Sequence, residues 1–215
     1  MNNEAAFRLL PFKEYVGSGF FDPIRWYYWP ILGKMYRRRV QLCLNECRGG
    51  DKVLEIGFGT GLTFFSLAER YDEIHGLDLN SDVVGVTSLF REHGIYPRLR
   101  NGNAVSLPYE DSSFQTVLLI SILEHLQPKE LAQTFSEIRR VLRKGGQVVY
   151  GVPVERPLMN WAFRFMGHDV RQMHFSSETQ IAAAAREHLQ EEKLISMDSI
   201  PAFFGQVYEI GHFIK

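Results

Sequence analysis

The sequence is poor in cysteine, with only Cys43 and Cys47 among 215 residues. Two cysteines are too few for a disulfide framework. Their i, i+4 spacing suits one face of a helix and not a zinc knuckle, which needs more ligands. We therefore expect two reduced, partly buried thiols, as in a cytoplasmic protein, and no metal site.

The chain also lacks long apolar runs and a strong excess of charge of either sign. No run approaches the ~20 apolar residues that span a bilayer. The polar start, Met1 to Ala6, does not resemble a secretory signal. The net charge of −1 gives no strong field to attract nucleic acid. These absences predict a protein that neither crosses a membrane nor binds nucleic acid.

What the chain does contain is enough apolar sequence for one domain over residues 1–215. Apolar residues make up 45% and charged residues 23%, which is typical of a globular protein. Strand-like and helical patterns alternate, which favours an α/β fold with right-handed crossovers and helices on both faces of a sheet. The expected strands are about 53–56, 74–79, 97–100, 114–120, 147–152, 194–200 and 207–214, and the expected helices are about 31–47, 62–70, 82–93, 129–142 and 177–188.

The final two strands are joined by a short link, too short for a parallel crossover. We therefore expect them to form an antiparallel hairpin at the edge of the sheet. The prediction is a seven-stranded, mostly parallel sheet with this C-terminal hairpin.

Aromatic residues crowd the N-terminal part, residues 1–48. The segment Trp26 to Trp29 is followed by the basic cluster Arg37 to Arg39. Three interpretations stay open: a lid over a binding site, a helix that packs its aromatics on the sheet, and an anchor at a membrane surface.

A glycine-rich loop follows the first expected strand. In open α/β sheets, ligands bind beyond the carboxyl ends of the strands, at the point where strand order reverses. Glycines at alternate positions let the backbone turn sharply and leave room for a ligand. A dinucleotide site would have the spacing G-x-G-x-x-G. Here the spacing is G-x-G-x-G, and Glu55 precedes it, which suits a ligand carrying an ammonium and a sulfonium better than a pyrophosphate.

Asp78 stands at the end of the second expected strand. An acid at this place accepts hydrogen bonds from ribose hydroxyls in nucleotide-binding sheets. The alternative is a helix N-cap, but Asn80 or Ser81 fills that role better.

In combination, these motifs strongly resemble the class I methyltransferases that use S-adenosylmethionine, in particular the branch with the ubiquinone and menaquinone methyltransferases. The resemblance covers about Asp51 to Pro153 and implies a Rossmann-like fold. Further motifs in the family's order are Gly102 to Phe114 as the adenine loop, Ile120 to Leu126 as the end of the fourth strand, and Val141 to Gly146 as the turn into the fifth.

The sequence departs from this family at two positions. Asn103 stands where the family usually has Asp, but its amide oxygen still accepts from the adenine amine. Gln115 stands where the family often has Asp, and we interpret it as structural. Neither change excludes activity.

The resemblance implies S-adenosylmethionine as the cofactor and assigns residues to it by matching position. The loop after the first strand meets the methionine part, Asp78 the ribose, Leu79 and the 103–104 pair the adenine, and the end of the fourth strand the methionine end. The cofactor-binding set is Glu55, Gly57, Phe58, Gly59, Thr60, Gly61, Asp78, Leu79, Asn103, Ala104, Ile120 and Ser121.

The predicted function is methyl transfer to a small-molecule or lipid-like acceptor. His125 is the candidate general base, with a structural or donor-binding role as the alternative. Two other functions stay open: a nicotinamide-dependent oxidoreductase, and a protein that binds S-adenosylmethionine without transferring the methyl group. The sequence leaves the oligomeric state open. Candidates on the acceptor side are Tyr15, Trp26, Tyr27, His125, Arg156, His168 and His174.

Overall fold

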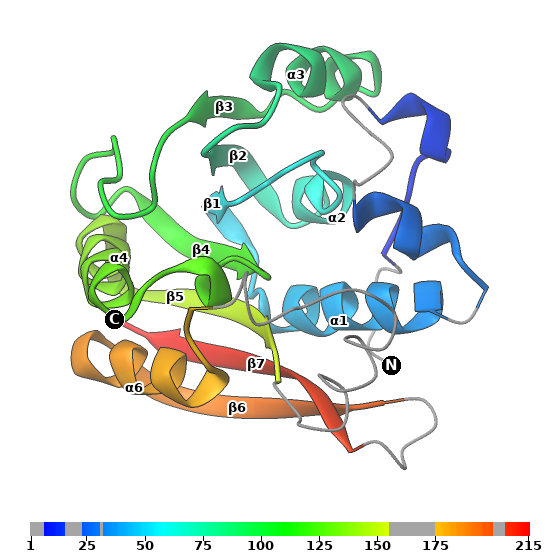
Figure 1. Ribbon diagram of the computed structural model, residues 1–215. Helices are drawn as coiled ribbons and strands as arrows, with labels where there is room; N and C mark the ends of the chain where they lie inside the picture. Colours follow the sequence, from blue (N-terminus) through cyan, green and yellow to red (C-terminus); the bar gives the residue numbers. More distant parts are fainter. Residues whose placement is uncertain (1–6, 16–22, 31, 155–174, 200–204) are drawn as a thin grey trace.

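The computed structural model describes residues 7–15, 23–30, 32–154, 175–199 and 205–215. Seven strands form one sheet in the order β3-β2-β1-β4-β5-β7-β6 (Figure 1). The first five pair in parallel, and β7 is antiparallel to both of its neighbours. This confirms the predicted mostly parallel sheet and its C-terminal hairpin. The strands are β1 Gly50–Ile56, β2 Tyr71–Asp78, β3 Arg98–Asn101, β4 Phe114–Ile120, β5 Leu142–Pro153, β6 Gln190–Asp198 and β7 Gln206–Ile214.

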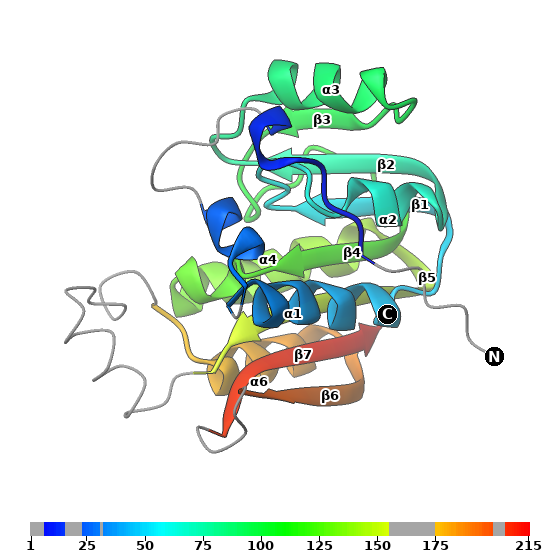
Figure 2. The same ribbon diagram turned by 90° about the vertical axis from the view of Figure 1, so that its right-hand side faces the viewer.

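The strand order reverses between β1 and β4. From β1 the chain adds β2 and β3 on one side, and then returns to add β4 and β5 on the other. Figure 2 shows the parallel strands ending at one common edge, where the 3-10 helix η2 (Pro23–Tyr28) and the start of α1 also lie. A ligand site is therefore expected at this edge, beside the ends of β1 and β4.

Helices cover both faces of the sheet. One face carries α1 (Leu32–Glu46), α2 (Phe64–Ala68) and α3 (Val83–Glu92), and the other carries α4 (Pro128–Val141) and α6 (Glu178–His188) (Figure 1). Strand side chains alternate between the two cores. On β4, Leu118 belongs to the first core, while Val117 and Leu119 belong to the second. The sheet is thus buried on both sides, and its edges and loops are left for ligands.

Several boundaries differ from the sequence-based expectation. The helix expected over 62–70 is limited to Phe64–Ala68, because the left-handed backbone at Gly61, with φ +77°, holds residues 60–63 in a turn. Strand β5 begins at Leu142, directly after α4, and includes the glycines of 144–146 that were expected to separate the two elements. Strand β6 begins at Gln190, and the expected end at Ile200 lies outside the described residues.

The aromatic N-terminal segment packs partly into the first core. Tyr15, Ile24 and Tyr27 are buried there, whereas Trp29 remains about half exposed, at 52%. Packing on the sheet is therefore observed for part of the segment. A further role as a lid or membrane contact stays a prediction. No helix in the described part of the chain is long and apolar enough to cross a membrane.

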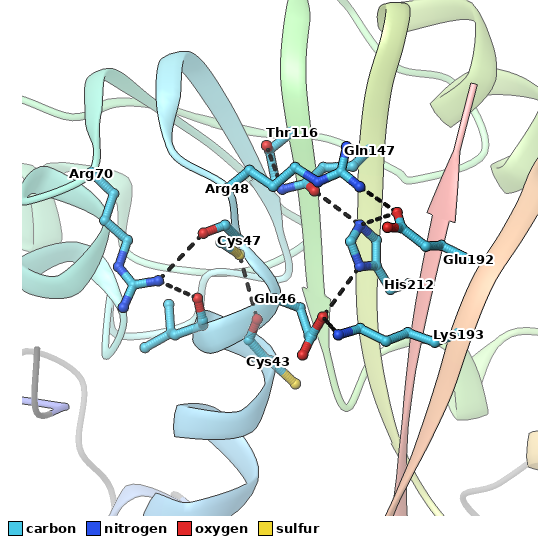
Figure 3. A network of polar contacts seen from close by, with 11 residues as sticks. Cys43, Glu46, Cys47, Arg48, Arg70, Thr116, Gln147, Glu192, Lys193 and His212 are labelled. Atoms are coloured by element: carbon cyan, nitrogen blue, oxygen red, sulfur yellow. Dashed lines mark hydrogen bonds and ion pairs between the residues drawn. The ribbon is translucent and has the colours of Figure 1, made fainter. Parts of the chain in front are cut away.

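A buried polar network fastens α1 to the sheet at the edge opposite the expected site (Figure 3). The Nε2 atom of His212 on β7 lies 2.9 Å from Oε1 of Gln147, and its Nδ1 atom lies 3.2 Å from Oε2 of Glu46 at the end of α1. The side-chain amide of Gln147 donates to the hydroxyl of Thr116 over 3.1 Å. Burial lowers the pKa of His212, while the carboxylates of Glu192 and Glu46 act in the opposite direction.

Both expected thiols lie on the sheet-facing side of α1. Cys43 and Cys47 are free, as the sequence predicted, and they are buried more completely than expected. Burial raises the pKa of Cys47 to about 12, so this thiol is not ionised at neutral pH.

Candidate active site at the carboxyl edge of the sheet

The glycine-rich loop leaves β1 at the switch point of the sheet. Gly57, Gly59 and Gly61 all have left-handed backbones, with φ values of +78°, +53° and +77°. A Cβ atom on Gly57 would collide with Ile122, and one on Gly61 with Phe90 and Phe64. A Cβ atom on Gly59 would meet no atom within 4 Å among the described residues. Gly57 and Gly61 therefore allow close packing, while the backbone at Gly59 faces open space.

Asp78 connects this loop to the end of β2. Its Oδ2 accepts from the backbone N–H of Gly59 over 2.9 Å, and its Oδ1 accepts from Asn80 and Ser81 over 2.9 and 3.0 Å. A carboxylate has about four acceptor directions, so about one remains for a ligand hydroxyl. The carboxylate thus orders the loop as well as offering an acceptor.

The N-cap of α3 is not where the sequence reasoning placed it. Asp82 caps this helix by accepting from the N–H of Gly85 over 2.9 Å, so the expectation of Asn80 or Ser81 was wrong. The backbone N–H groups of those two residues both donate to Oδ1 of Asp78.

Apolar and amide groups flank Asp78 on the side of β3. Leu79 is 62% exposed, which is unusual for a leucine directly after a buried strand. The following loop is held near it, because Gly102 N–H donates to the carbonyl of Asp78 over 3.0 Å. Ala104 is buried, and Oδ1 of Asn103 accepts from Val105 N–H over 3.2 Å. An exposed apolar side chain and the loop at residues 102–104 thus both follow directly from the end of β2 and β3.

Glu55 lies beneath the loop, with an exposed fraction of 4%. The hydroxyl of Thr63 donates to its carboxyl group. Burial raises the pKa of Glu55 to about 8; the hydrogen bond from Thr63 lowers it and the charge of Asp78 raises it. Its contact with a methionine moiety stays a prediction.

We expect Glu55→Gln to remove a pH-dependent loss of stability. Because the folded pKa of about 8 lies above the ordinary 4.5, the folded protein keeps a proton that the unfolded chain has released. Stability should therefore fall as pH rises through this window. The variant should melt higher than the parent at about pH 9 and like the parent at about pH 5. Melting temperatures measured across this range test the prediction, and parallel curves for the two proteins would contradict it.

Phe58 and Thr60 are the two non-glycine residues of the loop in the predicted cofactor-binding set. The Phe58 ring is buried, packs 5.9 Å from the ring of Phe64 and lies against Gly76, so only its backbone faces the loop surface. Thr60 is half-buried in the turn before α2.

The end of β4 forms the other wall of the site. Ile120 is half-buried, and Ser121 adopts a left-handed backbone with φ +57°. The N–H of Ser121 donates to Gly151 O over 2.8 Å, and its hydroxyl lies 2.9 Å from that of Tyr208 on β7. His125 is exposed on the short helix η3 (Leu123–His125), which follows directly.

Two side chains at this wall escaped the sequence reasoning. Glu124, next to His125, is buried, and its Oε2 has no hydrogen-bond partner. Burial raises its pKa to about 8, while its own backbone N–H and the charge of Arg39 lower it. Tyr208 reaches the site only because β7 pairs with β5, placing it opposite Pro153. No local signal in the sequence marks that pairing.

The predicted acceptor-side residues are only partly described. Tyr27 is buried and Trp26 half-buried on η2, while the hydroxyl of Tyr15 accepts from Leu10 N–H over 3.2 Å within the core. Arg156, His168 and His174 lie outside the described residues. Within the part of the chain that the structure covers, no group of three or more metal-ligating side chains gathers.

Gln115 has the structural place that its position suggested. Its Oε1 accepts from Asp51 N–H over 3.1 Å at the start of β1, and its side chain fills the space beside Gly50.

Known proteins that are similar to this chain include several methyltransferases. Residues 53–146 match the family model of a methyltransferase domain. Phosphatidylethanolamine N-methyltransferase of Cereibacter sphaeroides is 34% identical over 116 residues, covering 53% of this chain and 55% of that protein. Demethylmenaquinone methyltransferase of Bacillus velezensis is 31% identical over 121 residues, covering 54% of this chain and 51% of that protein. The chain spans about half the length of the curated relatives it matches.

A solved structure shows the same fold. Geranyl diphosphate C-methyltransferase from Streptomyces coelicolor A3(2), in complex with Mg²⁺, geranyl diphosphate and S-adenosyl-L-homocysteine, is similar with a TM-score of 0.70. The similarity covers 85% of this chain and 78% of that one, at 17% identity. The fold and the matched region confirm the resemblance to class I S-adenosylmethionine-dependent methyltransferases that the motifs predicted.

Proposed function

We propose that this protein transfers a methyl group from S-adenosylmethionine to a small-molecule or lipid-like acceptor. The observation that carries the proposal is the junction at Asp78. This carboxylate, at the end of β2, holds the open-faced backbone of Gly59 beside the end of β1. The exposed side chain of Leu79 lies next to it, so a carboxylate acceptor, an exposed apolar side chain and a stretch of backbone free of neighbouring side chains occur together.

The residues present fit the cofactor in three parts. The loop from Gly57 to Gly61, above Glu55, would receive the methionine moiety. Asp78 would accept from a ribose hydroxyl, while Leu79 and the loop at Asn103 and Ala104 would meet the adenine. The backbone of Ile120 and Ser121 would face the methionine end from β4.

Bound at this edge, the cofactor supplies an activated methyl group on a sulfonium. The protein must then hold the acceptor close and in line, and exclude competing water. His125 is placed by η3 beside the end of β4, where it would take a proton from an acceptor that loses one on methylation.

The class of methyl acceptor is supported by the names of similar proteins and by the aromatic N-terminal segment, and not by contacts at the site. The relatives' names point to phosphatidylethanolamine, demethylmenaquinone and geranyl diphosphate, which are lipid or isoprenoid molecules of different head-group chemistry. The aromatic-rich helix η2 lies near the same edge (Figure 2), and its aromatic residues would suit an apolar acceptor.

Calorimetry with S-adenosylhomocysteine and with NADH tests the cofactor assignment. We expect S-adenosylhomocysteine to bind and NADH not to bind. Tight binding of NADH alone would instead favour a nicotinamide-dependent oxidoreductase.

Transfer of label from methyl-labelled S-adenosylmethionine to a lipid extract or small-molecule pool tests the activity. Mass spectrometry would identify the product by the gain of one CH₂. Donor binding without any labelled product would favour a binding protein that does not transfer the methyl group.

A further inference from the structure

The third arginine of the 37–39 cluster is turned toward the interior. Arg38 is exposed, as a basic surface cluster would predict, but most of the Arg39 side chain is buried, and its Nε atom is fully so. The positive charge of Arg39 is therefore largely removed from solvent, unlike that of Arg38.

Three tyrosines surround the Arg39 guanidinium. Its Cζ lies 4.0 Å from the ring centre of Tyr36 and 5.6 Å from those of Tyr27 and Tyr208. One terminal nitrogen donates to the hydroxyl of Tyr27 over 3.2 Å. Tyrosine rings stabilise a cation through their electron-rich faces but do not neutralise it. The three rings come from η2, α1 and β7, so only the tertiary structure builds this cage.

No carboxylate in the described part of the chain forms an ion pair with Arg39, and its Nε has no hydrogen-bond partner there. Glu124 is the described acid whose ionisation responds to this arginine, but burial raises the pKa of Glu124 to about 8. At neutral pH that carboxyl is therefore mostly protonated. A buried cation without a counter-ion is costly and attracts an anion.

The cage lies beside the proposed donor site. Tyr208, one wall of the cage, is hydrogen-bonded to Ser121 at the end of β4. The donor is assigned to the ends of β1, β2 and β4, so the acceptor must approach over the end of β5 and the start of the antiparallel strand β7. Tyr208 lies at that place, opposite Pro153.

We infer that Arg39 in its tyrosine cage is the acceptor subsite for an oxyanion group, a carboxylate or a phosphate. The guanidinium of Arg39 would donate a charge-assisted hydrogen bond to the anion, and the tyrosines would hold it in place. The site would select anionic acceptors and disfavour those presenting an ammonium. This inference rests on the proposed function, because it takes the donor to lie beside β4.

Small aromatic probes test the charge preference without knowledge of the natural acceptor. Benzoate, phenyl phosphate, neutral benzamide and cationic trimethylphenylammonium would be titrated by ligand-observed NMR, with and without S-adenosylhomocysteine. We expect at least one of the two anions to bind about tenfold or more tightly than benzamide, as one charge-assisted hydrogen bond allows. Comparing benzoate with phenyl phosphate distinguishes a carboxylate from a phosphate as the preferred group.

Substitutions locate the binding. Arg39→Gln should abolish the anion preference, Arg39→Lys should restore part of it, and the exposed neighbour Arg38→Gln should leave it unchanged. The Nε–H resonance of Arg39, assigned by its loss in Arg39→Lys, should shift when the anion binds, which a purely structural arginine would not show.

Equal binding of benzamide and both anions to the parent protein, or an unchanged anion preference in Arg39→Gln, would overturn the inference. Binding of S-adenosylhomocysteine to the same proteins is measured separately. Its failure in the parent would contradict the proposed function, while the probe titrations would still decide whether Arg39 binds oxyanions.

Discussion

Asp78→Ala should weaken the binding of S-adenosylhomocysteine by between about tenfold and about a hundredfold, the equivalent of one lost charge-assisted hydrogen bond. The structure gives the change a second effect. The carboxylate also accepts from the N–H of Gly59, so the variant releases the loop that the ligand must contact. Part of the loss would therefore be the cost of ordering the loop on binding. Isothermal titration calorimetry on parent and variant measures the change.

Asp82→Ala is the matched control for this substitution. Asp82 is an acid four residues further along the chain. It caps α3 by accepting from Gly85 N–H and, among the described residues, forms no hydrogen bond with the glycine-rich loop. Loss of the cap should lower stability by about 1 kcal/mol and leave ligand affinity as in the parent. If Asp78→Ala bound S-adenosylhomocysteine as tightly as the parent does, the ribose would have to lie elsewhere.

The second large effect is expected at the opposite edge of the sheet, where Gln147→Leu should lower the free energy of unfolding by about 2–4 kcal/mol. Gln147 is buried and connects Thr116 on β4 with His212 on β7 (Figure 3). Leucine fills a similar volume but makes neither hydrogen bond, so a buried imidazole nitrogen loses its best partner. Urea unfolding of parent and variant gives the difference.

Arg48→Ala serves as the comparison for that substitution. Arg48 pairs with Glu192 in the same region, but both side chains are largely exposed, so its loss should cost no more than about 1 kcal/mol. Both variants should bind S-adenosylhomocysteine like the parent, because the network is remote from Asp78. A cost for Gln147→Leu as small as that for Arg48→Ala would mean that the network contributes little to stability.

The donor side of the site could be predicted largely from the sequence, because its determinants are local. The glycines at 57, 59 and 61, and the acid at the end of β2, act through their own backbone positions and through strand ends that hydrophobic patterning reveals. The hydrogen bonds that the Asp78 carboxylate accepts from the backbone could not be predicted in this way. The sequence suggested an acceptor for ribose hydroxyls, but the structure shows that most of its acceptor capacity already orders the loops.

The acceptor side depends on residues that are distant in the chain. The sequence alone determined the α/β class, the mostly parallel sheet, the C-terminal hairpin and the nucleotide-binding loop, since periodicity and glycine spacing are local properties. Only the tertiary structure turned Arg39 inward and brought Tyr27, Tyr36 and Tyr208 around it. It did so because the pairing of β7 with β5 and the packing of α1 and η2 decide which side chains share a buried space, and no single segment carries that information.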